Sequence, residues 1–244
     1  MQGLPNSVYS VAGVREIDRT AIEDVGIPGY TLMTRAGEAA VHAIRKNFPD
    51  AQAWQIVCGA GNNAGDGYVV ARLAAQDGII VSVTAVADPE SLRGDAATAY
   101  ADFRAAGGTV DAWSGSLVAE AEVVVDALLG SGLQRDVAGE YAAAGDAINA
   151  HGGSVVAIDI PTGLNGDTGA VMGTAVRADL TVTFVGLKSG LFLDAGPECR
   201  GELVYAGLEI DDECRKGVGT KLRRIDTCAL RERLPRRRRS AHKG

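Results

Sequence analysis

The sequence is poor in aromatic residues and in the patterns that build metal centres and cross-links. Phe, Trp and Tyr make up 5% of its 244 residues, so aliphatic side chains must fill the core, as they do in parallel sheets covered by helices. The three histidines are scattered and the four cysteines form no C-x-x-C pair, which argues against a zinc site and a disulfide framework. Cys58 ends an apolar run, and we interpret it as a small core residue rather than a nucleophile.

Long hydrophobic stretches are also missing. No run approaches the roughly 18 apolar residues that a membrane span needs, and the N-terminus lacks a basic segment followed by an apolar one. The length fits one α/β domain with a short appendage. We therefore expect a cytoplasmic protein that has no membrane partner.

The net charge of −7 is the sum of two parts of the chain whose net charges have opposite signs. Residues 215–244 carry 12 Lys and Arg against 2 acidic residues, or +10, whereas residues 1–214 carry −17. Such an acidic body is not typical of nucleic-acid binders, so no nucleic-acid partner is expected. The run from Arg236 to Arg239 could form a nucleic-acid patch, but a solvated basic linker is the favoured interpretation. We therefore divide the chain into a domain of residues 1–214 and a basic linker of residues 215–244.

Hydrophobic spacing predicts a three-layer α/β/α sandwich. Two amphipathic helices are predicted near the N-terminus, the first ending before Gly26 and Pro28 and the second before Pro49. After them, short Val- and Ile-rich runs alternate with helices of roughly 10 to 15 residues, which predicts a Rossmann-like, mostly parallel sheet. The predicted strands cover residues 55–58, 79–86, 123–128, 155–160, 180–184 and 203–206, and the predicted helices begin after Asp66 and cover 94–106 and 139–150.

Four turns at one edge of this sheet carry unusual polar residues. Ligands of such sheets bind beyond the carboxyl ends of the strands, where these turns lie. A single carboxylate often only caps a helix, but Asp126 and Asp159 each run into a turn with Gly or Pro, which favours a functional role. The four turns are GAGNNAGDG (59–67), DALLGSG (126–132), DIPTG (159–163) and FVGLKSG (184–190), and they should aim Asn63, Asp126, Asp159, Thr162 and Lys188 at one site.

The first turn also satisfies the dinucleotide fingerprint G-x-G-x-x-G/A, through Gly59, Gly61 and Ala64. Its glycines let backbone N–H groups approach an anion, and the following helix N-terminus adds positive potential. An NAD-dependent oxidoreductase would also explain this turn, with Asp88 as the acid that binds ribose. That alternative leaves the other three turns unexplained.

Read together, the four turns resemble a known family. The runs GAGNNAGDG, VVDALLGSGL, AIDIPTGLNGDTG and ADLTVTFVGLKSGL are similar, in order and spacing, to the NAD(P)H-hydrate epimerases, the YjeF N-terminal domain family. The opening DRTAIEDVGIPGYTLMTRAGEAA resembles the family's N-terminal helices. The resemblance implies an isomerase that interconverts the R and S forms of hydrated NADH and NADPH in nicotinamide nucleotide repair. A non-catalytic interaction module of the same family is the alternative, but Asn63, Asp126, Asp159 and Lys188 are all present.

The resemblance also implies roles for residues. Asp159 would donate and then accept the proton of the ring hydroxyl. Lys188 would hold a substrate oxygen or lower the pKa of Asp159, unless it is a surface amine. A potassium ion beside the substrate would bind oxygen atoms of Asn63, Asp126 and Thr162, where Thr162 replaces the family's usual serine. The implied substrate-binding residues are Asn62, Asn63, Ala64, Gly65 and Asp66 in the first turn, Gly130, Ser131, Gly132, Leu133, Gln134, Arg135 and Asp136 in the second, and Asp159; for Arg135 a solvated loop residue is an equal alternative.

The end of the sequence resembles a further domain. The run LPRRRRSAHKG (234–244) is similar to the start of the ADP- or ATP-dependent dehydratase domain that follows the epimerase in many bacteria. We therefore expect this sequence to be the epimerase half of a bifunctional repair enzyme. The resemblance also implies a homodimer, for which the N-terminal helices would be a natural interface.

Overall fold

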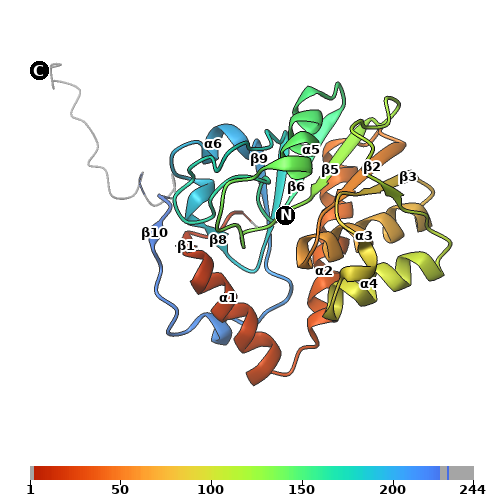
Figure 1. Cartoon of the computed structure of the whole chain (residues 1–244). Coiled ribbons are helices and arrows are strands. Elements are labelled where there is room, and N and C mark those ends of the chain that lie inside the picture. The colour runs from red at the N-terminus through yellow and green to blue at the C-terminus, as the bar shows by residue number, and fades with distance from the viewer. Residues whose placement is uncertain (1–2, 226–229, 231–244) are drawn as a thin grey trace, which may run out of the picture.

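The structure, a computed structural model, describes residues 3–225 and Leu230. The large sheet has seven parallel strands in the order β4-β3-β2-β5-β6-β7-β9, with helices on both faces (Figure 1). The predicted α/β/α sandwich is therefore confirmed. The strands are β2 (Ala53–Cys58), β3 (Ile80–Ala85), β4 (Asp111–Ala112), β5 (Val123–Ala127), β6 (Ser154–Ile158), β7 (Leu180–Phe184) and β9 (Glu202–Ala206).

Helices cover the two faces of the large sheet unequally. On one face lie α2 (Gly29–Asn47), α3 (Asn62–Gln76) and α4 (Gly94–Ala105), which share the largest apolar cluster with Ile56 and Val125. On the other face, α5 (Gly139–Ala150) packs on Val57 and Val124, the neighbours of those residues along the strands. Successive strand residues point to opposite faces, and both faces are buried. This is why the strands read as continuous apolar runs in the sequence.

A second, smaller sheet joins segments from the two ends of the described chain. Its order is β10-β1-β8, and it consists of β1 (Ser7–Tyr9), β8 (Leu187–Lys188) and β10 (Leu222–Arg223). β1 runs parallel to β8 and antiparallel to β10. Strands of two or three residues show no measurable alternation, so hydrophobic spacing did not predict them.

The two predicted N-terminal helices are both present. α1 (Val11–Arg19) continues into a π-helical turn, Thr20–Asp24, and α2 follows after a short connection. The inward side of α1 is apolar, with Val14 and Ile17 buried. A short helix, α6 (Gly196–Cys199), precedes β9. Figure 1 shows α1 beside the small sheet and at a distance from α4.

Part of the predicted linker packs on the domain. The Arg215 guanidinium donates to the carbonyl oxygens of Ile210 at 2.8 Å and Val185 at 3.2 Å. Arg224 donates to Leu4 O at 2.9 Å. The packing of this domain therefore continues past residue 214, the predicted boundary, at least as far as Arg224. The run of arginines at 236–239 lies outside the described residues.

The described residues also bear on the cysteines and on membrane spans. Cys58 is fully buried in the core, as predicted, and burial raises the pKa of its thiol. Cys199 and Cys214 are buried and free. Within residues 3–225, no helix combines the length and the apolar character needed to cross a membrane.

Candidate functional site

A cleft of about 880 Å³ opens at the carboxyl edge of the large sheet. The strand order changes direction between β2 and β5, and ligands of doubly wound sheets bind outside such a switch point. The loops after these two strands line the cleft, and α1 and α2 add Val14 and Met33. Asp159 and Lys188 also line it, so residues from all four polar turns meet at one place.

The glycine-rich turn is shorter than the sequence suggests. α3 was predicted to begin after Asp66 but begins at Asn62, so residues 62–66 form the first turns of a helix. Gly61 has a φ of 143°, which suits glycine, and a Cβ atom at Gly59 would lie 2.0 Å from Leu128 O. Gly65 serves packing, because its Cβ would lie 2.7 Å from Met33 Cε. The N-terminus of α3 therefore faces the cleft with its unpaired N–H groups.

Asp159 is held in a strained position at the end of β6. Its φ is +68°, in the left-handed region that non-glycine residues rarely adopt. Its backbone N–H donates to Val182 O at 2.8 Å, and its Oδ2 accepts a hydrogen bond from Ser131 N at 3.1 Å. Its Oδ1 accepts a hydrogen bond from Lys188 Nζ. The carboxylate therefore caps no helix, and it forms part of the wall of the cleft.

Lys188 is a buried cation rather than a surface amine. It lies on β8 with a relative exposure of 1%, and besides Asp159 its ammonium donates to Thr183 Oγ1 and Phe184 O, both at 3.0 Å. Burial alone would raise the pKa of Asp159, but the charge and hydrogen bond of Lys188, helped by Ser131, outweigh it and lower the pKa. Asp159 is thus a carboxylate at neutral pH.

A second buried pair, Asp126 and Thr162, lies below the cleft. Asp126 Oδ1 accepts from Thr162 Oγ1 at 2.7 Å, and Oδ2 accepts from Thr162 N at 2.8 Å. Leu128 N adds a bond of 3.2 Å, and the Thr162 hydroxyl accepts from Leu129 N at 2.9 Å. Burial raises the pKa of Asp126 to about 6 although these hydrogen bonds act in the opposite direction. We call Asp126, Asp159, Thr162 and Lys188 the strand-side cluster.

Asn63 differs from these residues because its side chain has no partner among the described residues. Its relative exposure is 9%, and neither amide atom makes a hydrogen bond there. A Cβ atom at Gly130 would lie 3.3 Å from both Asn63 Oδ1 and Asp159 Oδ2, so both oxygens face the Gly130 backbone. Buried amides normally have partners, and an unpaired one at a cleft is a group that a ligand can satisfy.

The cleft includes most of the expected substrate residues but not all of them. Ala64, Gly65 and Asp136 do not line it, and the first two are buried. Asp126 and Thr162 do not reach its surface either. The expected substrate residues that line the cleft are Asn62, Asn63, Asp66, Gly130, Ser131, Gly132, Leu133, Gln134, Arg135 and Asp159.

Three charged cleft residues were not predicted from the sequence. Arg15 and Asp18 extend from α1, which was expected to pack on the domain and to offer a dimer interface, and Asp95 comes from the first turn of α4. Arg15 Nη2 lies 3.1 Å from the position of a Cβ at Gly132. Asp18 stands four residues after the buried Val14, so an acidic residue near an apolar helix face was the signal that could have revealed it.

The acidic residues beside α3 lie in a shared environment. Burial raises the pKa of Asp66 well above its ordinary range; the charges of Asp159 and Asp18 add to this, and that of Lys188 acts against it. Burial also raises the pKa of Asp18, with smaller effects from Lys188, Asp159 and Asp95. Among the described residues, the side chains of Asp18, Asp66 and Asp95 make no hydrogen bond or ion pair. We call Asp18, Asn63, Asp66 and Asp95 the helix-side cluster.

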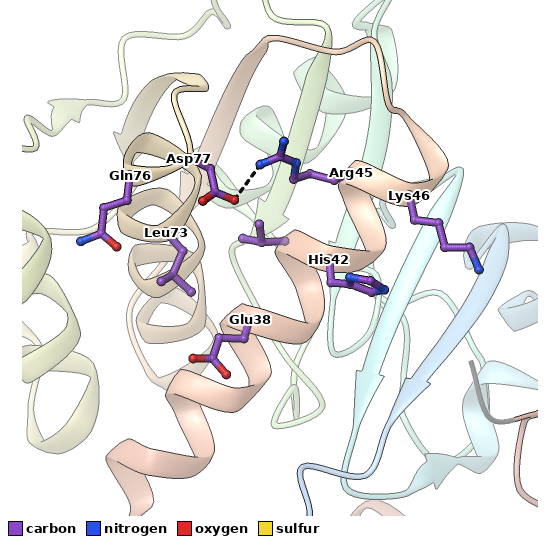
Figure 2. A pocket seen from close by; sticks show the side chains of 8 residues that line it. Glu38, His42, Arg45, Lys46, Leu73, Gln76 and Asp77 are labelled. Atoms are coloured by element: carbon purple, nitrogen blue, oxygen red, sulfur yellow. Dashed lines mark hydrogen bonds and ion pairs between the residues drawn. The ribbon is translucent and has the colours of Figure 1, made fainter.

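A second hollow, of about 450 Å³, lies between α2 and α3 (Figure 2). Its charged lining residues have mixed signs, and Arg45 pairs with Asp77 at 2.7 Å. Figure 2 shows Glu38 and His42 along one helix and Leu73 on the other. Both charges of that ion pair are half exposed, so water competes for them and the hollow lacks the buried polar groups of the cleft.

Asp88, the acid expected to bind ribose in a dehydrogenase, has a different role in the structure. The side chain of Asp88 accepts a hydrogen bond from Glu90 N at 3.0 Å and caps a short helical turn, Pro89–Ser91. It does not line the cleft. The one residue that supported ribose binding in the dehydrogenase interpretation thus has a local structural role.

The fold and the cleft define a class, the doubly wound α/β domains with a ligand cleft at the switch point of the sheet. Sequence comparison identifies the group within that class. The family described as YjeF-related protein N-terminus matches residues 29–190, and the chain belongs to this family.

Relatives of known name support this assignment. The chain is 42% identical over 237 residues to the bifunctional NAD(P)H-hydrate repair enzyme Nnr of Coxiella burnetii, covering 97% of this chain and 48% of the relative. It is 38% identical to the NAD(P)H-hydrate epimerase of Limosilactobacillus fermentum, covering 83% of this chain and 97% of that protein. The chain thus spans about half the length of the bifunctional relatives.

A solved structure agrees on the fold. The crystal structure of yeast ynu0 matches with a TM-score of 0.68 over 75% of this chain and 82% of that chain. The sequence identity is 21%, so this likeness speaks for the fold alone.

Proposed function

We propose that this domain is an isomerase that interconverts the R and S epimers of hydrated NADH and NADPH. The names of relatives that are 38% and 42% identical support this activity, and one of them is matched over 97% of its length. The observation that carries the proposal is the buried pair of Lys188 and Asp159, with Asp159 held in a left-handed backbone conformation at the cleft. Strain of this kind concentrates at functional sites.

Epimerisation requires proton transfer on both faces of one ring carbon. When the hydroxyl next to the ring nitrogen is protonated, the nitrogen lone pair expels water and leaves a planar iminium ion. Water that adds to the other face, and loses a proton, gives the opposite epimer. Asp159 is suited to accept that proton because its carboxylate is ionised at neutral pH, and Lys188 holds it in place.

The same cleft offers groups for the nucleotide part of the substrate. The N-terminus of α3, at Asn62 and Asn63, and the loop of residues 130–135 present backbone N–H groups that suit phosphate oxygens. Arg15 from α1 and Arg135 from the loop add two positive charges to the cleft. We assign the phosphates to these N–H groups and cations, and the nicotinamide ring to the side chain of Asp159.

We further propose that a potassium ion binds beside the substrate through Asn63, Asp126 and Thr162. Asn63 fits this role, because its buried amide oxygen lacks a partner among the described residues. Asp126 and Thr162 already bond to each other, so they would supply their remaining lone pairs. An oxygen-only ligand set with one carboxylate suits a weakly charged, hard cation. The ion would supply a fixed positive charge near the substrate.

The partner domain is inferred from the greater length of the relatives rather than from the fold. Because the chain covers 48% of the Coxiella burnetii bifunctional enzyme, we propose that it works with an ADP- or ATP-dependent dehydratase domain in a longer protein. The homodimer and the cytoplasmic location stay predictions.

The decisive experiment follows both epimers of hydrated NADH by chiral separation. Wild-type protein should equilibrate them, whereas Asp159→Asn should fold and bind nucleotide but react at least about a hundredfold more slowly. Near-normal turnover by Asp159→Asn would reject the assignment of this residue. An absorbance change that requires a second, oxidisable substrate would instead identify a dehydrogenase.

Potassium is tested by exchanging the cation. We expect activity in potassium buffer to fall when sodium replaces it, and Asn63→Leu to be insensitive to the exchange. Equal wild-type rates in the two buffers would argue against a functional ion.

A further inference from the structure

The reaction needs a proton donor, and Asp159 is poorly suited to be that donor. The Lys188 ammonium and the Ser131 N–H both bond to its carboxylate and lower its pKa. A carboxylate stabilised in this way is a ready proton acceptor but is seldom protonated at neutral pH. The group that protonates the leaving hydroxyl must therefore be sought elsewhere in the cleft.

Asp66 has the position for this task. It lies on α3, three residues after Asn63, so the two side chains share one face of the helix. Both line the cleft that Asp159 and Lys188 line from the ends of the strands. The carboxyl of Asp66 makes no hydrogen bond or ion pair with any residue in the described range 3–225, so its oxygens are available to a ligand.

Resting on the proposed epimerase function, we propose that Asp66 is the general acid of the reaction and that Asp159 is its general base. The protonated Asp66 carboxyl gives its proton to the ring hydroxyl, the carbon–oxygen bond breaks, and water leaves with the bonding electrons. The ring nitrogen lone pair forms the carbon–nitrogen double bond. A second water adds from the opposite face, and its proton passes to the Asp159 carboxylate. Asp159 then releases this proton to solvent water and Asp66 takes one up from it, which restores the starting protonation states of both groups; the reverse reaction passes through the same states in the opposite order.

The surroundings of Asp66 favour its protonated form. Asp18 from α1 and Asp159 from the end of β6 are both acidic, and Asp95 from α4 lies in the same cleft. The positive charge of Lys188 acts to lower the pKa of Asp66, but its ammonium already donates hydrogen bonds to Asp159, Thr183 and Phe184. Burial, together with the charges of Asp159 and Asp18, raises the pKa of Asp66, which is the condition for an acid that works near neutral pH.

The arrangement assigns opposite protonation states to two carboxyl groups in one cleft. One is kept ionised by a buried cation and the other is kept neutral by burial and by nearby negative charge. Pairs of acids whose surroundings separate their pKa values in this way divide the acid and base roles of many enzymes. Asn63 lies on the same helix face, so a ligand that satisfies its amide also lies close to Asp66.

The test compares Asp66→Asn with Asp66→Glu and with Asp77→Asn, a control at the C-cap of the same helix and outside the cleft. For Asp66→Asn we expect kcat for epimerisation to fall about 10²- to 10⁴-fold with KM changed less than about threefold. The wild-type rate should decline at alkaline pH as Asp66 loses its proton, and this decline should vanish in Asp66→Asn. Asp66→Glu should recover part of the rate, and Asp77→Asn should match the wild type.

The outcomes separate the acid role from the proposed function. An active wild type together with an Asp66→Asn variant that keeps more than about a tenth of kcat, or an unmoved alkaline decline, would overturn the acid role alone. An inactive wild type would overturn the epimerase function and the acid role with it. In the ligand-free protein, ¹³C NMR should place the titration of the Asp66 carboxyl above the ordinary value of about 4, and a midpoint at or below that value would also reject the proposal.

Discussion

The two sides of the cleft satisfy their polar groups in opposite ways. In the strand-side cluster, Asp159 bonds to Lys188, and Asp126 bonds to Thr162. In the helix-side cluster, the Asn63 amide is buried without a partner, and the carboxyls of the three aspartates make no hydrogen bond within the described range. The polar groups of the strand-side cluster have partners without a ligand, whereas those of the helix-side cluster would gain partners only when a ligand binds.

The difference separates groups that protein partners already hold from groups that have no partner among the described residues. Buried hydrogen-bonded groups keep one geometry, because breaking any of their bonds leaves a partner unsatisfied. Unpaired groups at a cleft lower the stability of the empty protein, and the binding of a ligand relieves this cost. Changes on the strand side should therefore weaken the fold, and changes on the helix side should weaken activity alone.

The largest effect is expected from Lys188→Met. Loss of the buried ammonium leaves the Asp159 carboxylate without its cation, which should destabilise the protein by about 3–5 kcal/mol. Catalysis should fall about 10²- to 10⁴-fold, because the pKa of Asp159 then rises. Urea unfolding and chiral separation measure the two effects.

A double variant controls for the loss of the pair. Lys188→Met with Asp159→Asn removes both charges, so it should regain most of the stability but none of the activity. If the double variant were as unstable as Lys188→Met, the uncompensated charge would not be the cause.

A smaller loss is expected from Thr162→Val. The side chains are similar in shape, but valine removes one of the two hydrogen bonds to Asp126 Oδ1, which then keeps only the bond from Leu128 N, and it leaves Leu129 N without its partner. The expected cost is about 1–3 kcal/mol in the free energy of unfolding. Thr162→Ser keeps the hydroxyl and serves as the control. Equal stability of the valine and serine variants would show that this hydroxyl does not hold the strand-side cluster together.

The smallest effect on stability, and one of opposite sign, is expected from Asp66→Asn. The folded pKa of Asp66 is raised, so above the ordinary pKa of about 4 the folded state binds more protons than the unfolded state. Its penalty on stability is absent below that value and grows as the pH rises toward the folded pKa. Thermal unfolding should show equal stability of variant and wild type near pH 4 and a more stable variant at pH 7. A variant that is less stable at pH 7 would place Asp66 among the groups that hold the fold.

The layers of the domain were predictable because they rest on long, regular signals. Strands buried on both faces appear as uninterrupted runs such as residues 123–127, and the helices between them have clear spacing. The start of α3 was misplaced because Asn62 and Asn63, among glycines, look like a turn. The helix begins at these residues, and both of them line the cleft.

The site was only partly predictable for a similar reason. The rule for parallel sheets predicts that Asp126, Asp159, Thr162 and Lys188 lie at one edge of the sheet; Asp159 and Lys188 line the cleft there, whereas Asp126 and Thr162 do not reach its surface. Arg15 and Asp18 reach the cleft from α1, whose position over the sheet edge depends on long-range packing that no local pattern records. Gly65 looked like a ligand-binding glycine, but it allows α2 and α3 to approach each other.

The small sheet constrains how this domain can be shortened. β10 covers one side of β1, and the other side of β1 pairs with β8, which carries Lys188. A chain truncated at residue 214 would leave β1 as an open strand edge, which is a template for aggregation. It would also remove support from β8 and its Lys188. A soluble and active fragment should therefore extend beyond Arg224, well past the point at which the charge of the sequence changes sign.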